Sequence, residues 1–160
     1  MRNLPDHSGA NSARFWSVVE GAVKEVSAFR FEVEGASMLP VLWPKDHVTV
    51  RVCSWPHVKP GDIVFGRSKR GATLHRVLCV QGIRNAQTKA FDFSFVTQGD
   101  AADQTECMPV EQCVGVVEKA YRNGKAISLN SRNGFKRIAL LGLYQNNRLM
   151  RAITARVGLA

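Results

Sequence analysis

The chain has 160 residues, of which 45% are hydrophobic and 22% charged, and its formal net charge is +9. This length and composition indicate one globular domain with its own core. The longest uninterrupted apolar stretch, Ile138 to Tyr144, is far shorter than the roughly 20 residues that a membrane-spanning helix needs, so the sequence predicts no such helix. The polar N-terminus lacks the apolar core of a secretory signal, and we expect a cytoplasmic protein.

The spacing of cysteines and histidines argues against a metal site. No two of the four cysteines stand in a C-x-x-C pair, and their scatter through apolar runs is typical of reduced thiols in a protein core. The histidines show no ligand spacing with them, so we expect neither a metal ion nor another cofactor. The cysteines are Cys53, Cys79, Cys107 and Cys113.

The chain divides into a short helix and a long strand-rich region. Residues 1–11 carry no structural prediction, and residues 12–28 predict an amphipathic helix because apolar side chains recur there at helical steps. From residue 29 to 129, short β-rich runs alternate with turn signals such as Asn123-Gly124. Many short strands without intervening helices predict a mainly β fold, a compact and partly closed β domain. The predicted strands are 29–33, 47–52, 63–65, 74–80, 91–96 and 110–118.

Residues 130–160 predict a basic helical extension. They carry six basic and no acidic residues, and apolar side chains such as Phe135 and Ile138 recur at helical steps. A basic helix with an apolar stripe can lie on an anionic bilayer. Two expectations stay open: residues 132–158 contact the inner membrane surface as a peripheral segment, or they pack on the β domain with their arginines in water.

Ser37 and His75 are the candidate catalytic pair. A serine hydroxyl attacks an amide only when a neighbouring base removes its proton, and imidazole suits that task near neutral pH. Ser37 stands in Gly35-Ala36-Ser37-Met38-Leu39-Pro40, and His75 lies near the start of an apolar, strand-like run. The pair predicts a serine hydrolase.

Four motifs in this order resemble the signal peptidase I superfamily, which also contains the self-cleaving SOS repressors. They are Ser37-Met38-Leu39-Pro40, Gly61-Asp62-Ile63-Val64, the strand with His75, and Gly99-Asp100, and together they cover over half of the chain. In the bacterial enzymes the base is a lysine; histidine at this position is similar to the archaeal and endoplasmic-reticulum branch. The resemblance implies the β fold of that superfamily, with Ser37 as nucleophile and His75 as general base.

The resemblance also implies a carboxylate that orients the imidazole of His75. Asp100 matches the Gly-Asp motif of the family, and Asp103 ranks equally with it, while Glu106 is a third candidate. A departure from the family pattern is Lys45, which stands where relatives have glycine. The turn at this position must therefore adopt a conformation that lysine tolerates.

Backbone amides are expected to stabilise the reaction's oxyanion. We expect the amide of Ser37 to be the main donor, with Ala36 shaping the same turn, because Gly35 replaces the serine that some bacterial relatives use as a second donor. The substrate would be an extended peptide or precursor protein that binds by strand addition and is cut after a small residue, a preference implied by the family. Met38, Pro40 and Leu74 are the expected substrate-binding residues.

Two other functions remain open at this stage. One is a non-catalytic module derived from a peptidase that binds a peptide or, through the basic extension, a nucleic acid. The other is a self-cleaving, repressor-like protein, which is disfavoured by the histidine base and by the short segment before the β region. For the peptidase we expect a peptide or protein partner and no nucleic acid.

Overall fold

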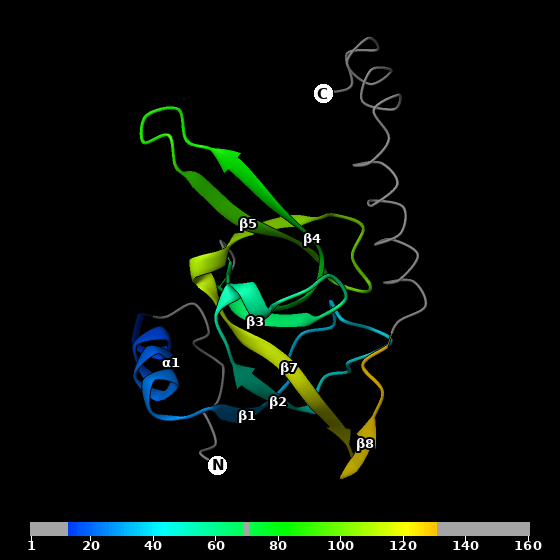
Figure 1. Ribbon diagram of the computed structural model, residues 1–160. Coiled ribbons are helices and arrows are strands. Elements are labelled where there is room, and N and C mark those ends of the chain that lie inside the picture. Colours follow the sequence, from blue (N-terminus) through cyan, green and yellow to red (C-terminus); the bar gives the residue numbers. More distant parts are fainter. Residues whose placement is uncertain (1–12, 69–70, 131–160) are drawn as a thin grey trace.

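The computed structural model describes residues 13–68 and 71–130. In this part of the chain an N-terminal helix, α1 (Ala13–Glu25), precedes a strand-rich region that curls into a half-barrel (Figure 1). The predicted mainly β fold with a leading helix is confirmed. No helix in these ranges has the length and apolarity needed to cross a membrane. The predictions for residues 1–11 and for the basic extension after Asn130 lie outside the described residues.

The described strands form one antiparallel sheet in the order β1-β2-β7-β3-β4-β5-β6, and β8 pairs with β7. The strands are β1 (Ala28–Glu32), β2 (His47–Val52), β3 (Ile63–Ser68), β4 (Gly71–Arg84), β5 (Phe91–Gln98), β6 (Glu106–Pro109), β7 (Cys113–Arg122) and β8 (Lys125–Ile127). Two short 3-10 helices, η1 (Trp55–His57) and η2 (Val110–Gln112), lie between them.

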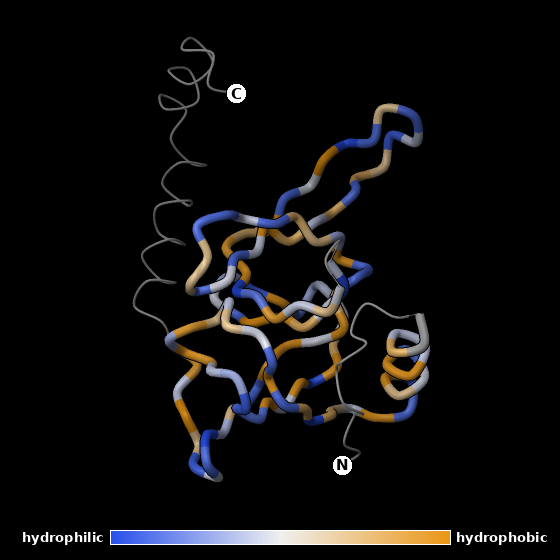
Figure 2. Tube along the Cα trace, turned by 180° about the vertical axis from the view of Figure 1, so that it is seen from behind, coloured by the Kyte–Doolittle hydropathy of each residue, from blue (hydrophilic) through white to orange (hydrophobic). Residues whose placement is uncertain are grey.

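The two faces of the curled sheet build two apolar clusters. Successive side chains of a strand point to opposite faces, so Phe65 of β3 packs in one cluster and its neighbour Val64 in the other. Helix α1 covers the first cluster, where the ring of Trp16 stacks on Phe65 with 6.0 Å between centroids. Figure 2 shows hydrophobic sections along the strands, interrupted by short hydrophilic ones.

The predicted strands differ from the observed ones at their ends. The prediction for 47–52 matches β2, but the run predicted at 110–118 begins with η2, and β7 starts at Cys113. Strands β6 and β8 were not predicted, since each is only three or four residues long. The Asn123-Gly124 turn joins β7 to β8 with positive φ at both residues (49° and 76°), as this dipeptide favours in a tight hairpin.

All four cysteines are free thiols. The prediction that they lie in the core is wrong for Cys107, which is exposed on β6 because the alternate position, Met108, takes the buried side. Burial, together with the neighbouring Cys53, raises the pKa of the Cys113 thiol to about 12. A thiol with so high a pKa stays protonated and unreactive near neutral pH.

Two strand edges of the described sheet are open, and residues of both line one cleft. Strand β1 is the end of the sheet and pairs with β2 alone among the described strands. Strand β4 begins at Gly71, but its pairing with β5 begins only at Arg76. The segment from Gly71 to His75 therefore has β3 on one side and no strand partner on the other within the described residues.

Candidate active site

Ser37 lies in a loop that main-chain hydrogen bonds close at its base. The amide of Val33 donates to the carbonyl oxygen of Asp46 at 2.8 Å, and the amide of Lys45 donates to the carbonyl oxygen of Val33 at 2.7 Å. Between these ends, the side chain of Met38 is buried and anchors the loop in the first apolar cluster. Ser37 itself is exposed, as a residue that must meet a substrate has to be.

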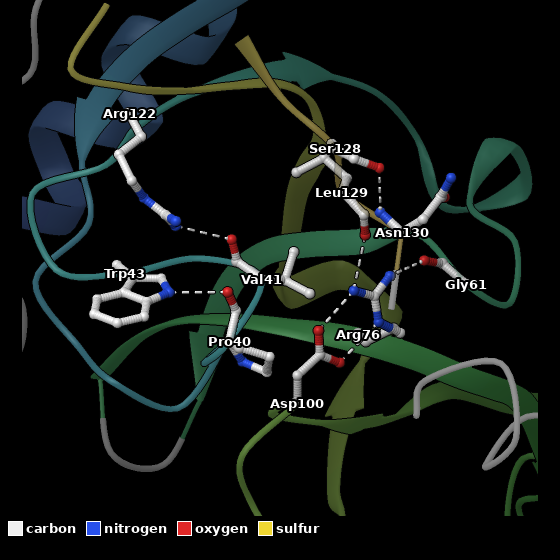
Figure 3. A network of polar contacts seen from close by, with 10 residues as sticks. All are labelled: Pro40, Val41, Trp43, Gly61, Arg76, Asp100, Arg122, Ser128, Leu129 and Asn130. Atoms are coloured by element: carbon white, nitrogen blue, oxygen red, sulfur yellow. Dashed lines mark hydrogen bonds and ion pairs between the residues drawn. The ribbon is translucent and has the colours of Figure 1, made fainter. Parts of the chain in front are cut away.

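Asp46 holds the far end of this loop. Its buried carboxylate accepts hydrogen bonds from the Trp43 amide at 2.7 Å and from the guanidinium of Arg122 at 2.9 and 2.7 Å. Burial by itself raises the pKa of Asp46, but the bonds from Arg122 and Trp43 outweigh it, so the pKa lies below its usual value. Arg122 also donates to the carbonyl oxygen of Val41 at 3.2 Å (Figure 3). Lys45 takes a φ of 73°, so this turn does need the left-handed conformation that glycine adopts most easily.

Gly99 brings the serine loop against the strand that carries the base. A Cβ atom at Gly99 would lie 2.5 Å from the carbonyl oxygen of Ser37 and 3.0 Å from its Cβ, so no other residue fits here without a shift. The same carbonyl oxygen accepts a hydrogen bond from the Ala101 amide at 2.9 Å. Gly99 directly follows β5, whose last residue pairs with Arg76. The Ser37 loop therefore packs at the end of β5, next to the residue that pairs with Arg76, the neighbour of His75.

His75 and Glu106 form a pair across the sheet. The imidazole Nδ1 lies 3.4 Å from Oε2 of Glu106, and the two side chains are 12% and 28% exposed. Glu106 opens β6, which pairs with β5 through Thr97, while β5 pairs with β4, so the contact crosses one intervening strand. This contact is an approach of the two groups without hydrogen-bond geometry. A carboxylate at this distance would stabilise the imidazolium form of His75, with Nε2 as the ring nitrogen on the other side.

Asp100 has a different partner. Its carboxylate accepts two hydrogen bonds from Arg76, at 2.8 Å from Nε and 2.7 Å from Nη2, and both side chains are buried. The same guanidinium donates to the carbonyl oxygens of Gly61 at 2.8 Å and Leu129 at 3.0 Å (Figure 3). Arg76 and Asp100 thus tie β4, the preceding turn and the end of the described chain together. This pair fixes the strand segment next to His75.

The structure therefore distinguishes the three acidic candidates. Glu106 lies beside His75, whereas Asp100 is engaged by Arg76. Asp103 is exposed, and no ion pair of the described residues includes it. Of the three acidic candidates, Glu106 is therefore the one whose carboxylate lies beside His75, and the catalytic roles expected of Asp100 and Asp103 stay predictions.

The amides expected to stabilise an oxyanion are available. Neither the amide of Ala36 nor that of Ser37 donates a hydrogen bond among the described residues, and both residues are exposed. The turn is nevertheless ordered, because the carbonyl oxygen of Ala36 accepts the amide of Leu39 at 3.2 Å. An amide held in place but without an acceptor is what oxyanion stabilisation requires.

A cleft of about 160 Å³ lies beside Ser37. Met38 and Leu74, two of the three expected substrate-binding residues, line it. Pro40 does not; it is exposed, and its carbonyl oxygen accepts the indole N–H of Trp43 at 2.9 Å. The volume is below the roughly 300 Å³ at which small-molecule sites begin, so the cleft suits a side chain of a larger substrate. The other lining residues are Phe31, Glu32, Val33, Glu34, Gly35, Phe65, Ala72 and Thr73.

Arg76, Glu32 and Glu34 belong to the site region and were not identified from the sequence. The signal for Arg76 was present, because a charged residue inside the apolar run Leu74-His75-Arg76-Val77 requires a buried partner. Nothing in the sequence marks the two glutamates as site residues, because polar residues at alternate positions of a strand are usually only exposed to solvent.

In the part of the chain that the structure describes, no cluster of three or more His, Cys, Asp or Glu side chains could hold a metal ion. No protein-family model matches this chain. No curated protein matches it either.

Proposed function

We propose that this protein is a serine endopeptidase of the signal peptidase type, with Ser37 as nucleophile, His75 as general base and Glu106 as the residue that orients the base. The observation that carries the proposal is the contact between Glu106 and Nδ1 of His75, on the strand segment that follows the cleft residue Leu74. Ser37 lines the same cleft. A nucleophile, a base and an orienting carboxylate are the groups that amide hydrolysis by serine needs.

In this mechanism Oγ of Ser37 attacks the peptide carbonyl carbon while Nε2 of His75 takes the hydroxyl proton. Glu106 stabilises the imidazolium, and the amide of Ser37 donates to the developing oxyanion. The imidazolium then gives its proton to the departing amine, which leaves an ester on Ser37. A water molecule activated by His75 hydrolyses this ester and returns the enzyme to its starting state.

The open strand edges support an extended peptide as substrate. A peptide lying between β1 and the first residues of β4 can form main-chain hydrogen bonds with either edge, as in strand addition. A small side chain of the peptide would enter the cleft beside Ser37, which agrees with cleavage after a small residue. The binding mode needs no prior opening of the sheet.

The test incubates the full chain with a mixture of unfolded peptides that contains no other protease. The new peptide N-termini are then mapped. We expect cleavage sites that disappear with Ser37→Ala and with His75→Ala, while circular dichroism shows an unchanged fold for both variants. His57→Ala is the matched control, because His57 is exposed and hydrogen-bonds locally to Ser54. Cleavage that persists in Ser37→Ala or His75→Ala would contradict the mechanism.

We propose further that the peptidase works in the cytoplasm or at the inner face of the membrane. The support is the sequence of residues 132–158, whose six basic residues can each add roughly 1 kcal/mol of attraction to an anionic surface. Co-sedimentation with vesicles containing anionic lipid should be lost with Arg148→Gln/Arg151→Gln/Arg156→Gln. Equal sedimentation with neutral vesicles would contradict this location.

A further inference from the structure

The cleft beside Ser37 has an acidic rim. Glu32 and Glu34 are the only charged residues among its described lining residues, and both are exposed. Among the described residues no ion pair joins either carboxylate to a cation. Within the described ranges, two carboxylates without a paired cation therefore border the cleft.

The negative charge of this rim is opposite in sign to the net charge of the whole chain, which is +9. Most positions of such a protein repel a basic ligand, whereas a concave site with two carboxylates attracts one locally and orients it on approach.

The spacing of the two carboxylates matches an extended peptide. Phe31 and Val33 are buried, so Glu32 and Glu34 share the opposite, outward side of the strand. Val33 continues the pairing of β1 through its hydrogen bonds with Lys45 and Asp46. Alternate residues of an extended chain are about 6.6 Å apart, both in this segment and in a peptide that pairs with it. Two basic side chains separated by one residue would therefore each face one carboxylate.

We propose that the cleft selects an extended peptide that carries two basic side chains at alternate positions within a few residues of the bond to be cut. The inference rests on the proposed peptidase function for its placement next to a scissile bond, but the binding preference itself requires only the cleft. Glu32 and Glu34 are then specificity-determining residues of the site.

The test measures peptide binding by the full-length Ser37→Ala variant, so that no peptide is consumed. The probes are three fluorescent ten-residue peptides of alanine and valine that are identical except for two alternate positions, which hold lysine, glutamine or glutamate. Exposed charge pairs contribute up to about 1 kcal/mol each, so we expect the lysine peptide to bind about fivefold or more tightly than the glutamine peptide at low salt, and the glutamate peptide to bind most weakly. High salt should reduce the difference.

Glu32→Gln/Glu34→Gln in the same background should abolish the preference for lysine. Glu111→Gln/Glu118→Gln is the matched control: it removes the same charge from exposed positions that do not line this cleft, and it should keep the preference. Equal binding of the lysine and glutamine peptides, no binding of the lysine peptide, or a preference that survives Glu32→Gln/Glu34→Gln would overturn the proposal.

The peptidase proposal is tested separately, by measuring cleavage of the same peptides with the wild-type chain, which has Ser37. If the lysine peptide binds selectively through Glu32 and Glu34 but is never cut, the cleft inference stands and the peptidase proposal fails. If the peptide is cut in a Ser37-dependent way with the same kcat/KM as its glutamine counterpart, and the two also bind equally to Ser37→Ala, the peptidase proposal stands and the cleft inference fails.

Discussion

Oε2 of Glu106 lies 3.4 Å from Nδ1 of His75, although β5 separates the strands on which the two residues stand. Glu106 is the first residue of β6 and pairs with Thr97 near the end of β5, from where its side chain reaches His75. In the proposed mechanism this contact leaves Nε2 of His75 for the substrate, and the orienting acid lies outside the Gly-Asp motif.

Replacing Glu106 tests this relationship directly. Glu106→Gln should lower kcat/KM by about 100-fold or more, because loss of the carboxylate of a triad destabilises the correct imidazole tautomer and the imidazolium. Glu106→Asp, which keeps the charge on a shorter side chain, should recover part of the activity. Asp103→Asn is the control and should change kcat/KM by less than about twofold, since exposed positions away from the chemistry contribute little. A larger loss in Asp103→Asn than in Glu106→Gln would return the role to Asp103.

We expect Asp100 to contribute mainly to the stability of the fold and not directly to catalysis. Asp100→Asn leaves the buried guanidinium of Arg76 without its charge partner, and breaking a buried ion pair costs about 3–5 kcal/mol. We expect the midpoint of urea unfolding to fall accordingly. If Asp100→Asn unfolds like the wild type but is inactive, Asp100 belongs to the catalytic machinery after all.

Gly99→Ala should damage the site more than the fold. The added Cβ would meet the carbonyl oxygen of Ser37, so the serine loop must move away from β4. Misplacement of a catalytic group by about 1 Å costs on the order of 100-fold in rate, while overpacking costs about 1–3 kcal/mol of stability. Kinetics and urea unfolding measure the two effects.

Gly21→Ala is the matched control for this substitution. Gly21 lies in α1 with nothing within 4 Å of an added Cβ, so alanine should stabilise the helix by about 0.5–1 kcal/mol and leave kcat/KM unchanged. Full activity in Gly99→Ala would show that the loop tolerates displacement, against the positioning role assigned to this contact.

The sequence predicts those parts of the molecule whose signal is local. Alternation over 47–52 predicts β2, and the Asn123-Gly124 pair predicts a turn, because a few adjacent residues decide each outcome. Ser37 and His75 were likewise identified from short motifs. The contact of Glu106 with His75 depends instead on the register of three strands, which no short motif encodes. The position of Glu32 and Glu34 at the cleft could not be predicted either, because residues from β1 and β4 line that cleft together.

The pH dependence of stability should reveal the role of Asp46. Its pKa is lowered in the folded protein, since the bonds from Arg122 and the Trp43 amide outweigh the effect of burial, so ionised Asp46 favours the folded state. That contribution is complete above the pKa of an unfolded aspartate, about 3.9, and is lost as pH falls from there through the lower folded pKa. Asp46→Asn should therefore lower Tm at pH 7, and the gap to the wild type should narrow below about pH 4.

Thermal unfolding at pH 7, 4 and 3 measures this gap. Glu118→Gln is a suitable control, because Glu118 is exposed and forms no ion pair among the described residues. A gap between Asp46→Asn and the wild type that is as large at pH 3 as at pH 7 would mean that packing of the Asp46 side chain, and not its charge, closes the serine loop. Since the same carboxylate holds the Trp43 end of that loop, the proposed peptidase activity should fall along with Tm in Asp46→Asn at neutral pH.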